Sequence, residues 1–141
     1  MSLKELEHKT KNIKHRTRKY MSFYDDLKIK MHQYVKDIYK VSKNFPKEEL
    51  YGIVSQLRRA ALSVILNFIE GYARRKGNNC KVFQNFLEIS YGSLKESKYL
   101  IYFSYTEGYI SKENYNKLLV MADEIGKMLW NIISKNPKQK T

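Results

Sequence analysis

Hydrophobic residues recur at helical spacing along most of this chain, and they are densest between residues 50 and 76. In this stretch, LYGIVSQLRRAALSVILNFIEGYARRK, apolar positions alternate at spacings of four and three, the pattern of a bundle seam: Leu50, Val54, Leu57, Ala61, Val64 and Phe68. Flanking apolar residues extend the arc to roughly 240°, whereas a surface helix needs roughly 100°. The excess predicts a second buried contact, most simply with another copy of the chain. The candidate interface residues are Leu62, Ile65, Ile69 and Tyr72.

The opposite side of the same helix carries a narrow polar stripe. Its members fall within about 80° of one another at 3.6 residues per turn: Gln56, Arg59, Ser63, Asn67, Glu70 and Arg74. The stripe has three interpretations, namely a solvated face, a partly buried polar network, or a face that contacts a ligand. In a network, Arg59 and Glu70 would each need a partner to offset the loss of solvation.

Three further segments have helical periodicity, at about residues 24–44, 79–106 and 111–135. Pro46 suits the first turn of the helix that ends near Lys76, and Ser111 suits the N-cap of the last helix. Short loops between long helices favour antiparallel neighbours. We therefore predict an all-α fold, an antiparallel up-down-up-down four-helix bundle. Its last three helices are expected to have about 25–28 residues each, or roughly 40 Å.

The third predicted helix contains small residues, which would let a neighbouring helix approach closely. These residues are Ser90, Gly92, Ser93 and Ser97. Because a glycine inside a helix costs about 1 kcal/mol relative to alanine, Gly92 is expected to have a packing role.

The chain of 141 residues divides into a basic extension (1–22), a bundle domain (23–135) and a basic tail (136–141). Its net charge is +13, and residues 1–21 and 58–81 each contribute +5. A field of one sign favours an anionic partner, a nucleic acid or an anionic membrane surface. The candidate nucleic-acid-binding residues are Lys14, Arg16, Arg18, Lys19, Arg58, Arg59, Arg74, Arg75, Lys76 and Lys81.

Two functional hypotheses follow from this charge. In the first, the protein is a non-enzymatic RNA- or DNA-binding accessory protein, with Tyr20, Tyr24 or Tyr72 available to stack on unpaired bases, although packing is the commoner role for such rings. In the second, it is an assembly module that recruits a protein partner, and the charge is incidental. Salt-sensitive binding to nucleic acid would separate the two hypotheses.

The sequence lacks the patterns of catalytic and cofactor sites. His8, His15 and His32 are far apart, no phosphate-binding glycine motif occurs, and the single cysteine, Cys80, has no activating base nearby in the sequence. We expect no enzyme activity, no metal and no cofactor.

No apolar run reaches the roughly 18 residues of a membrane span, and the N-terminus has no apolar signal core. A cytoplasmic protein without membrane contact is therefore expected.

Six short segments occur in a fixed order along the chain: FYDDLK (23–28), FPKEELYG (45–52), SQLRRAALS (55–63), NFIEG (67–71), GSLKE (92–96) and GYIS (108–111). Together they resemble the bacterial four-helix-bundle family of ribosomal-RNA intervening-sequence proteins, over about residues 23–134. The resemblance implies an antiparallel four-helix bundle and assembly into a ring-shaped homopentamer. A related branch, the accessory variability proteins of diversity-generating retroelements, implies binding to nucleic acid and to a reverse transcriptase.

The resemblance also assigns individual residues. Positions that match the family's motifs are Arg58, Arg59, Ser63, Asn67, Glu70, Gly71 and Glu96. It implies roles in fold and assembly for them, with Arg59, Ser63, Asn67, Glu70 and Glu96 forming the candidate polar network. The chain departs from the family at Leu66, where a small or polar residue is common, and in its basic extension, which favours a member that handles nucleic acid.

Overall fold

The computed structural model describes residues 2–18, 22–75 and 80–135, and for residues 10, 12–18 and 80 it describes the backbone alone. In this part of the chain all regular elements are helical: α1 (Leu3–Arg18), α2 (Phe23–Ser42), a 3-10 turn (Lys47–Glu49), a π-helical turn (Leu50–Val54), α3 (Ser55–Ala73), α4 (Cys80–Thr106) and α5 (Lys112–Ser134). The predicted all-α class is confirmed.

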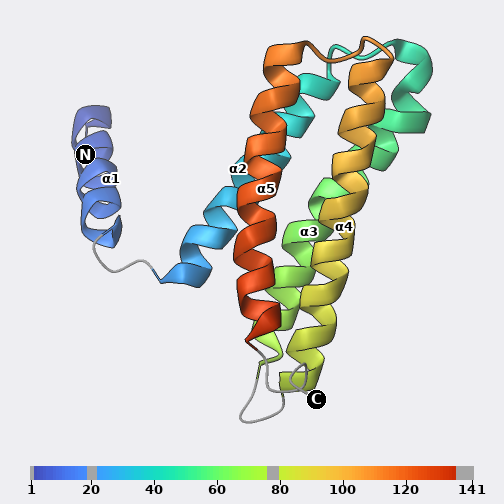
Figure 1. The fold of residues 1–141 in the computed structure, drawn as a ribbon. Helices are drawn as coiled ribbons and strands as arrows, with labels where there is room; N and C mark the ends of the chain where they lie inside the picture. Colours follow the sequence, from blue (N-terminus) through green and yellow to red (C-terminus); the bar gives the residue numbers. More distant parts are fainter. Residues whose placement is uncertain (1, 19–21, 76–79, 136–141) are drawn as a thin grey trace.

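Helices α2 to α5 lie side by side and form what we call the helical body (Figure 1). α3 packs most extensively on α4, α4 also packs on α5, and α2 packs on both α3 and α5.

Within the basic extension, the sequence has no sustained apolar stripe, yet residues 3–18 form α1. Figure 1 shows α1 apart from the helical body, and both Leu3 and Leu6 are exposed.

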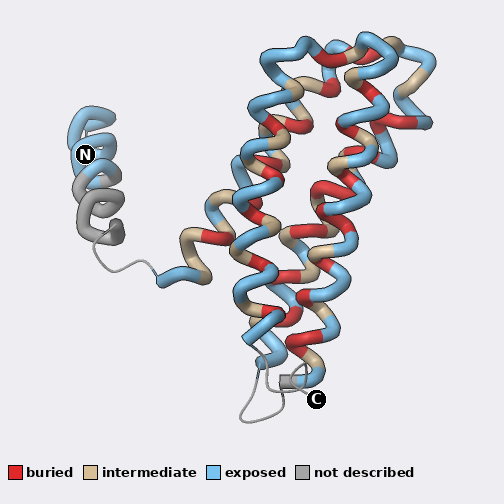
Figure 2. The backbone as a smooth tube through the Cα atoms, in the orientation of Figure 1, coloured by how far each residue is buried: buried red, intermediate tan, exposed pale blue. Residues whose placement is uncertain are grey.

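The core of the helical body consists of apolar residues at helical spacing, including five of the six residues of the predicted seam, Leu50 being the exception. Figure 2 shows buried residues along the facing sides of α2 to α5. The largest of the fully buried side chains are Leu27, Met31, Tyr34, Ile38, Leu57, Phe68, Leu87, Leu94, Ile101, Leu118, Ile125 and Leu129. Because each fully buried aliphatic side chain contributes about 1.5–3 kcal/mol, this continuous seam holds the four helices together.

The second predicted helix is not one continuous α-helix from Pro46 to Lys76. The backbone leaves the helical region at Gly52, with φ −103° and ψ −111°, and the α-helix runs from Ser55 to Ala73, only 19 residues. The Glu49 carboxylate accepts the Ile53 backbone N–H across this break, at 3.4 Å. Apolar spacing continues through the break, so periodicity alone could not reveal it. Leu50, which the sequence places on the seam, is exposed in the structure, and so is the adjacent Tyr51.

The ends of the other helices follow their capping residues. Ser22 and Asp25 form a reciprocal capping box at the start of α2, and Ser111 accepts the Asn114 backbone N–H at the start of α5. Gly108, with φ +79°, ends the turn after α4, where a residue with a Cβ would be strained. These boundaries agree with the predicted ones to within a few residues.

The close helix approach predicted at Gly92 occurs at Gly71 instead. A Cβ built on Gly92 would have no atom within 4 Å, whereas a Cβ on Gly71 would lie 2.6 Å from Cβ of Phe86. The prediction for Gly92 is therefore wrong within the described chain. The helical periodicity of the sequence does not indicate which glycine faces a neighbouring helix, because that depends on how α3 and α4 cross. The serines of α4 do face the core, and Ser90 donates to the Val64 carbonyl at 2.6 Å.

The segment Lys47–Ala73 is long and apolar enough, by length and composition, to cross a membrane, with a mean hydropathy of 1.2 over 18 residues. Within the helical body, its seam is in the core and 39% of this window is buried. This placement is consistent with a soluble protein. It also means that more than half of this moderately apolar window is not buried within the described chain.

Tyr34 gives the core a pH-dependent component. Its hydroxyl lies 2.7 Å from Ser97 Oγ, and because Ser97 donates to the Leu94 carbonyl, Tyr34 must be the donor between them. Burial raises the pKa of Tyr34 well above its ordinary value of 10.

We expect the free energy of unfolding to decrease as the pH rises above about 10, because the unfolded chain then releases the Tyr34 proton while the folded chain retains it. In Tyr34→Phe this decrease should be smaller. Denaturant titrations of both proteins between about pH 8 and 11 would measure it. Equal pH profiles would show that Tyr34 does not contribute to the alkaline loss of stability.

Candidate functional site

The polar stripe of α3 lies along the contact with α4. Ser63 Oγ lies 2.7 Å from Ser93 Oγ, and Asn67 Nδ2 donates to the Ser63 carbonyl and to Ser63 Oγ, at 2.8 and 2.9 Å. Arg59 donates to Glu96 Oε1 at 2.8 Å and to Gln56. Four of the five candidate network residues therefore make such contacts, but in two separate groups, Arg59 with Glu96 and Ser63 with Asn67. These contacts favour a role in joining α3 to α4.

Glu70 is placed differently from the rest of the candidate network. Its carboxylate accepts from Arg74 Nε at 2.6 Å, one helical turn away on the surface. Both side chains are about half exposed, so solvent screens the pair and its contribution to stability is small. Within the described residues, Glu70 thus pairs with Arg74 instead of with another member of the candidate network.

Arg58 connects α3 to the end of α2. Its Nε donates to Ser42 Oγ at 2.8 Å, and its guanidinium lies 4.6 Å from the centre of the Tyr39 ring. A cation at the last turn of a helix also stabilises the helix dipole. Among the candidate nucleic-acid-binding residues, Arg58 thus has much of its donor capacity engaged within its own chain.

The other end of α3 carries an exposed basic cluster. Arg75 lies over three aromatic rings, 4.6 Å from the centre of Tyr72 and 5.3 Å from that of Tyr24, with Phe83 further away. Tyr24 and Tyr72 pack against one another and against the Phe68 side chain in the core. Their rings are half-buried, so the two tyrosines serve mainly as packing within the chain.

The remaining candidate nucleic-acid-binding residues either lie at the surface of α4 or have side chains outside the described part of the structure. Lys81 is exposed at the start of α4. Lys14, Arg16 and Arg18 lie on the backbone of α1, but their side chains are outside the described part of the structure, as are Lys19 and Lys76 entirely. The exposed basic cluster is therefore defined here by Arg74, Arg75 and Lys81.

An apolar groove runs along the outer side of α3, and we call it the α3 groove. It has a volume of about 710 Å³, and its lining includes Leu50, Tyr51, Leu62 and Leu66 together with Arg58 and Arg59. Leu66 is 57% exposed, and Ile69, one turn further along, is 44% exposed. Two of the four interface candidates, Leu62 and Ile65, are half-buried beside them. Leu50 was predicted on the core seam, and that prediction is wrong because the helix is broken at Gly52 and Leu50 is exposed.

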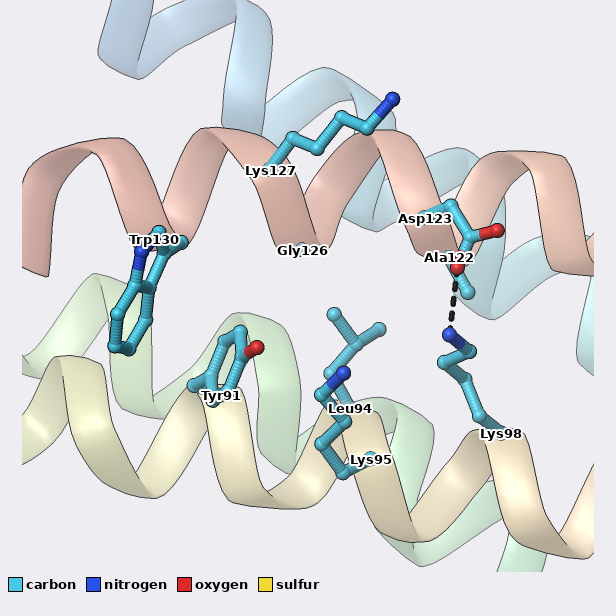
Figure 3. Close-up of a pocket in the computed structure, with 9 residues that line it drawn as sticks. All are labelled: Tyr91, Leu94, Lys95, Lys98, Ala122, Asp123, Gly126, Lys127 and Trp130. Atoms are coloured by element: carbon cyan, nitrogen blue, oxygen red, sulfur yellow. Dashed lines mark hydrogen bonds and ion pairs between the residues drawn. The ribbon is translucent and has the colours of Figure 1, made fainter.

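A second groove lies between α4 and α5, and we call it the α4–α5 groove (Figure 3). Its volume is about 290 Å³, and its side chains include Tyr91, Lys95, Lys98, Asp123 and Trp130. The Tyr91 and Trp130 rings lie 5.7 Å apart, and Lys98 Nζ pairs with Asp123 at 2.6 Å. Sequence reasoning did not identify this groove, because its residues belong to two helices and no local motif joins them.

Within the described residues, no three His, Cys, Asp or Glu side chains cluster closely enough to hold a metal ion. The described buried side chains also leave no polar nitrogen or oxygen without a hydrogen-bond partner. The expectations of no cofactor and no enzyme activity stay predictions. The candidate sites are thus two grooves and one basic cluster on the surface.

These features describe a small, basic, helical protein with two grooves and a basic cluster on the described part of its surface. Residues 26–131 match the 23S rRNA-intervening sequence protein family, and the chain belongs to that family. It is also similar in fold to a protein of unknown function from the S23 ribosomal protein family of Bacteroides thetaiotaomicron, with 23% identity and a TM-score of 0.69. The similarity covers 78% of this chain and 99% of the other. No curated protein matches the sequence. The relation to the retroelement branch stays a prediction.

Proposed function

We propose that this protein is a non-enzymatic, homo-oligomeric nucleic-acid-binding accessory protein. The observation that carries the proposal is the charge of +13 together with the exposed basic cluster at one end of α3. Lysine and arginine side chains bind phosphates and release condensed counterions, without reading sequence. The name of the family refers to 23S rRNA, so structured RNA is the first nucleic acid to test. A reverse transcriptase is a further partner only if the chain belongs to the retroelement branch.

The proposal includes an antiparallel up-down-up-down arrangement of the helical body. Contacts between opposite ends of successive helices support it: Tyr24 at the start of α2 lies 5.3 Å from Tyr72 at the end of α3, ring centre to ring centre. Tyr24 also contacts Phe83 near the start of α4. Phe45, just after α2, contacts Tyr109, just before α5.

The proposal also includes assembly of several copies into a ring. The exposed Leu66 of the α3 groove and the exposed Ile69, one turn further along α3, support an interface between copies, because contiguous exposed apolar surface is uncommon on monomers. The number five comes from the resemblance to pentameric members of the family. In a ring, each basic cluster occurs once per subunit, so a single RNA could bind several clusters and gain avidity.

The first test is RNA binding as a function of salt. We expect micromolar or tighter binding to structured RNA at low salt, with affinity falling steeply as salt rises. Neutralising the basic cluster with Arg75→Gln and Lys81→Gln should reduce the slope of log K against log salt by about 0.7–0.9 for each phosphate that the variant no longer neutralises. Fluorescence anisotropy of labelled RNA would measure both effects.

The matched control replaces two exposed lysines of other helices, Lys36→Gln with Lys117→Gln, which changes the net charge equally. Equal weakening in both double variants would indicate a general field effect instead of a defined cluster. Absence of binding at low salt would contradict the proposed function. It would favour the alternative, a module that recruits a protein partner through the α3 groove.

A further inference from the structure

The α4–α5 groove combines an exposed aromatic pair with a positive charge, and the packing of the two helices requires neither. The first feature is the aromatic pair: Trp130 is 51% exposed, and its ring lies 5.7 Å from that of Tyr91, at an angle of 42°. Figure 3 shows the two rings together at one end of the groove. A tryptophan whose role was only to pack within its own chain would be more deeply buried than Trp130. About half of this side chain is therefore available to a partner.

The second feature is the charge around the groove. Lys95 Nζ lies 5.1 Å from the centre of the Tyr91 ring, and its side chain is exposed. Lys98 is neutralised by Asp123, which is the acidic side chain among those lining this groove. Lys127 is also part of the lining, although Figure 3 shows its ammonium pointing away from the other side chains. The groove therefore has a net positive charge, with Lys95 closest to the rings.

The space between these two features comes from Gly126. It lies opposite Leu94 in Figure 3, and a Cβ built on it would only reach ordinary contact, 3.4 Å from Leu94 Cδ2. The packing of α4 on α5 therefore does not require a glycine here. Without a side chain at this position, the groove stays open between the aromatic pair and the Lys98–Asp123 pair.

We propose that the α4–α5 groove binds an unpaired nucleotide of a single strand. Its base would stack on Trp130, and its phosphate would lie at Lys95. Aromatic faces accept any base by stacking, and nearby ammonium groups bind the backbone, which is how proteins bind single strands without sequence preference. The inference rests on the proposed nucleic-acid binding and adds a second class of contact to it. The basic cluster of Arg74, Arg75 and Lys81 would bind phosphates of any strand, whereas this groove would select single-stranded regions.

Trp130 makes the proposal directly measurable, because it is the only tryptophan in the sequence. The experiment titrates the full chain at low salt with a short single-stranded RNA of mixed sequence, and separately with a blunt duplex of the same length. Tryptophan fluorescence reports on the groove, and anisotropy of the labelled RNA reports on all binding. We expect the single strand to quench Trp130 and the duplex to leave its emission nearly unchanged.

Two variants then separate stacking from charge. Trp130→Leu should weaken single-strand binding about tenfold and leave duplex binding unchanged, while Tyr99→Leu, at a 63% exposed tyrosine of α4 outside the groove, should change neither. Lys95→Gln should reduce the salt dependence of single-strand binding more than Lys36→Gln does. Circular dichroism would verify that each variant retains the wild-type helix content.

The outcomes that overturn the proposal differ from those that overturn the proposed function. RNA binding seen by anisotropy, with unchanged tryptophan emission and no effect of Trp130→Leu, would exclude the groove and leave the proposed function standing. No binding of either RNA would exclude both. A Trp130 signal that follows protein concentration alone would assign the groove to a second copy of the chain. Equal quenching by polyglutamate would show that the groove has no preference for a base.

Discussion

Leu66→Glu is expected to dissociate the proposed assembly into single chains. Leu66 is 57% exposed in the described chain and lines the α3 groove, and the half-exposed Ile69 lies one turn away. If a second copy covers this groove, a carboxylate at position 66 would lose its hydration at the contact between copies, at a cost of several kcal/mol. Ile69→Glu should have the same effect. Light scattering after size-exclusion chromatography would measure the mass of each variant.

The control for this experiment is Val120→Glu on α5. Val120 is 67% exposed, so the same apolar-to-acidic change is made at a similarly accessible position outside the α3 groove. We expect this variant to keep the wild-type mass. If Leu66→Glu and Ile69→Glu also keep it, the groove is not the contact between copies. A wild-type protein that is itself a single chain would contradict the proposed assembly.

Gly71→Ala is expected to lower the free energy of unfolding by about 1–3 kcal/mol, the usual cost of overpacking a core. The added Cβ would lie 2.6 Å from Cβ of Phe86 and 3.2 Å from a ring carbon of Phe83. Cβ of Phe86 is attached to the backbone and cannot rotate away, so α3 and α4 must move apart. Chemical denaturation monitored by circular dichroism would measure the decrease in stability.

Gly92→Ala is the matched control, because it makes the same change inside the adjoining helix, α4. Its Cβ would meet open space, so we expect stability to rise by about 0.5–1 kcal/mol through helix propensity alone. If Gly71→Ala is as stable as the wild type, the contact between α3 and α4 relaxes more easily than the geometry indicates. If Gly92→Ala lowers the mass of the assembly, a second copy packs against Gly92.

The contrast between these two glycines shows where the sequence stops being informative. Both lie inside amphipathic helices, and a glycine in that position predicts close packing in either case. Only the crossing of α3 and α4 places Gly71 against Phe86 and leaves open space beside Gly92. This crossing also explains the glycine of the Asn-x-x-Glu-Gly segment in physical terms, since no larger residue fits there without separating the helices.

The candidate sites divide in a similar way. The polar stripe of α3 could be predicted from spacing, because helical periodicity fixes which residues share a face. Its partners Ser93 and Glu96 belong to another helix, and only Glu96 could be anticipated, through the family resemblance. The α4–α5 groove could not be found from the sequence, because Tyr91 and Trp130 meet only after α4 and α5 pack.

The sequence by itself determined the helical class, the core seams, most helix ends and the family, because each depends on local periodicity, capping residues or short motifs. Tertiary structure alone decided the break at Gly52, the close approach at Gly71, the engagement of Arg58 with α2 and the two grooves. Each of these depends on the relative position of residues from different helices or on a backbone change that preserves the apolar spacing. The physical reason is that periodicity specifies which face of a helix is apolar, whereas packing geometry specifies what that face meets.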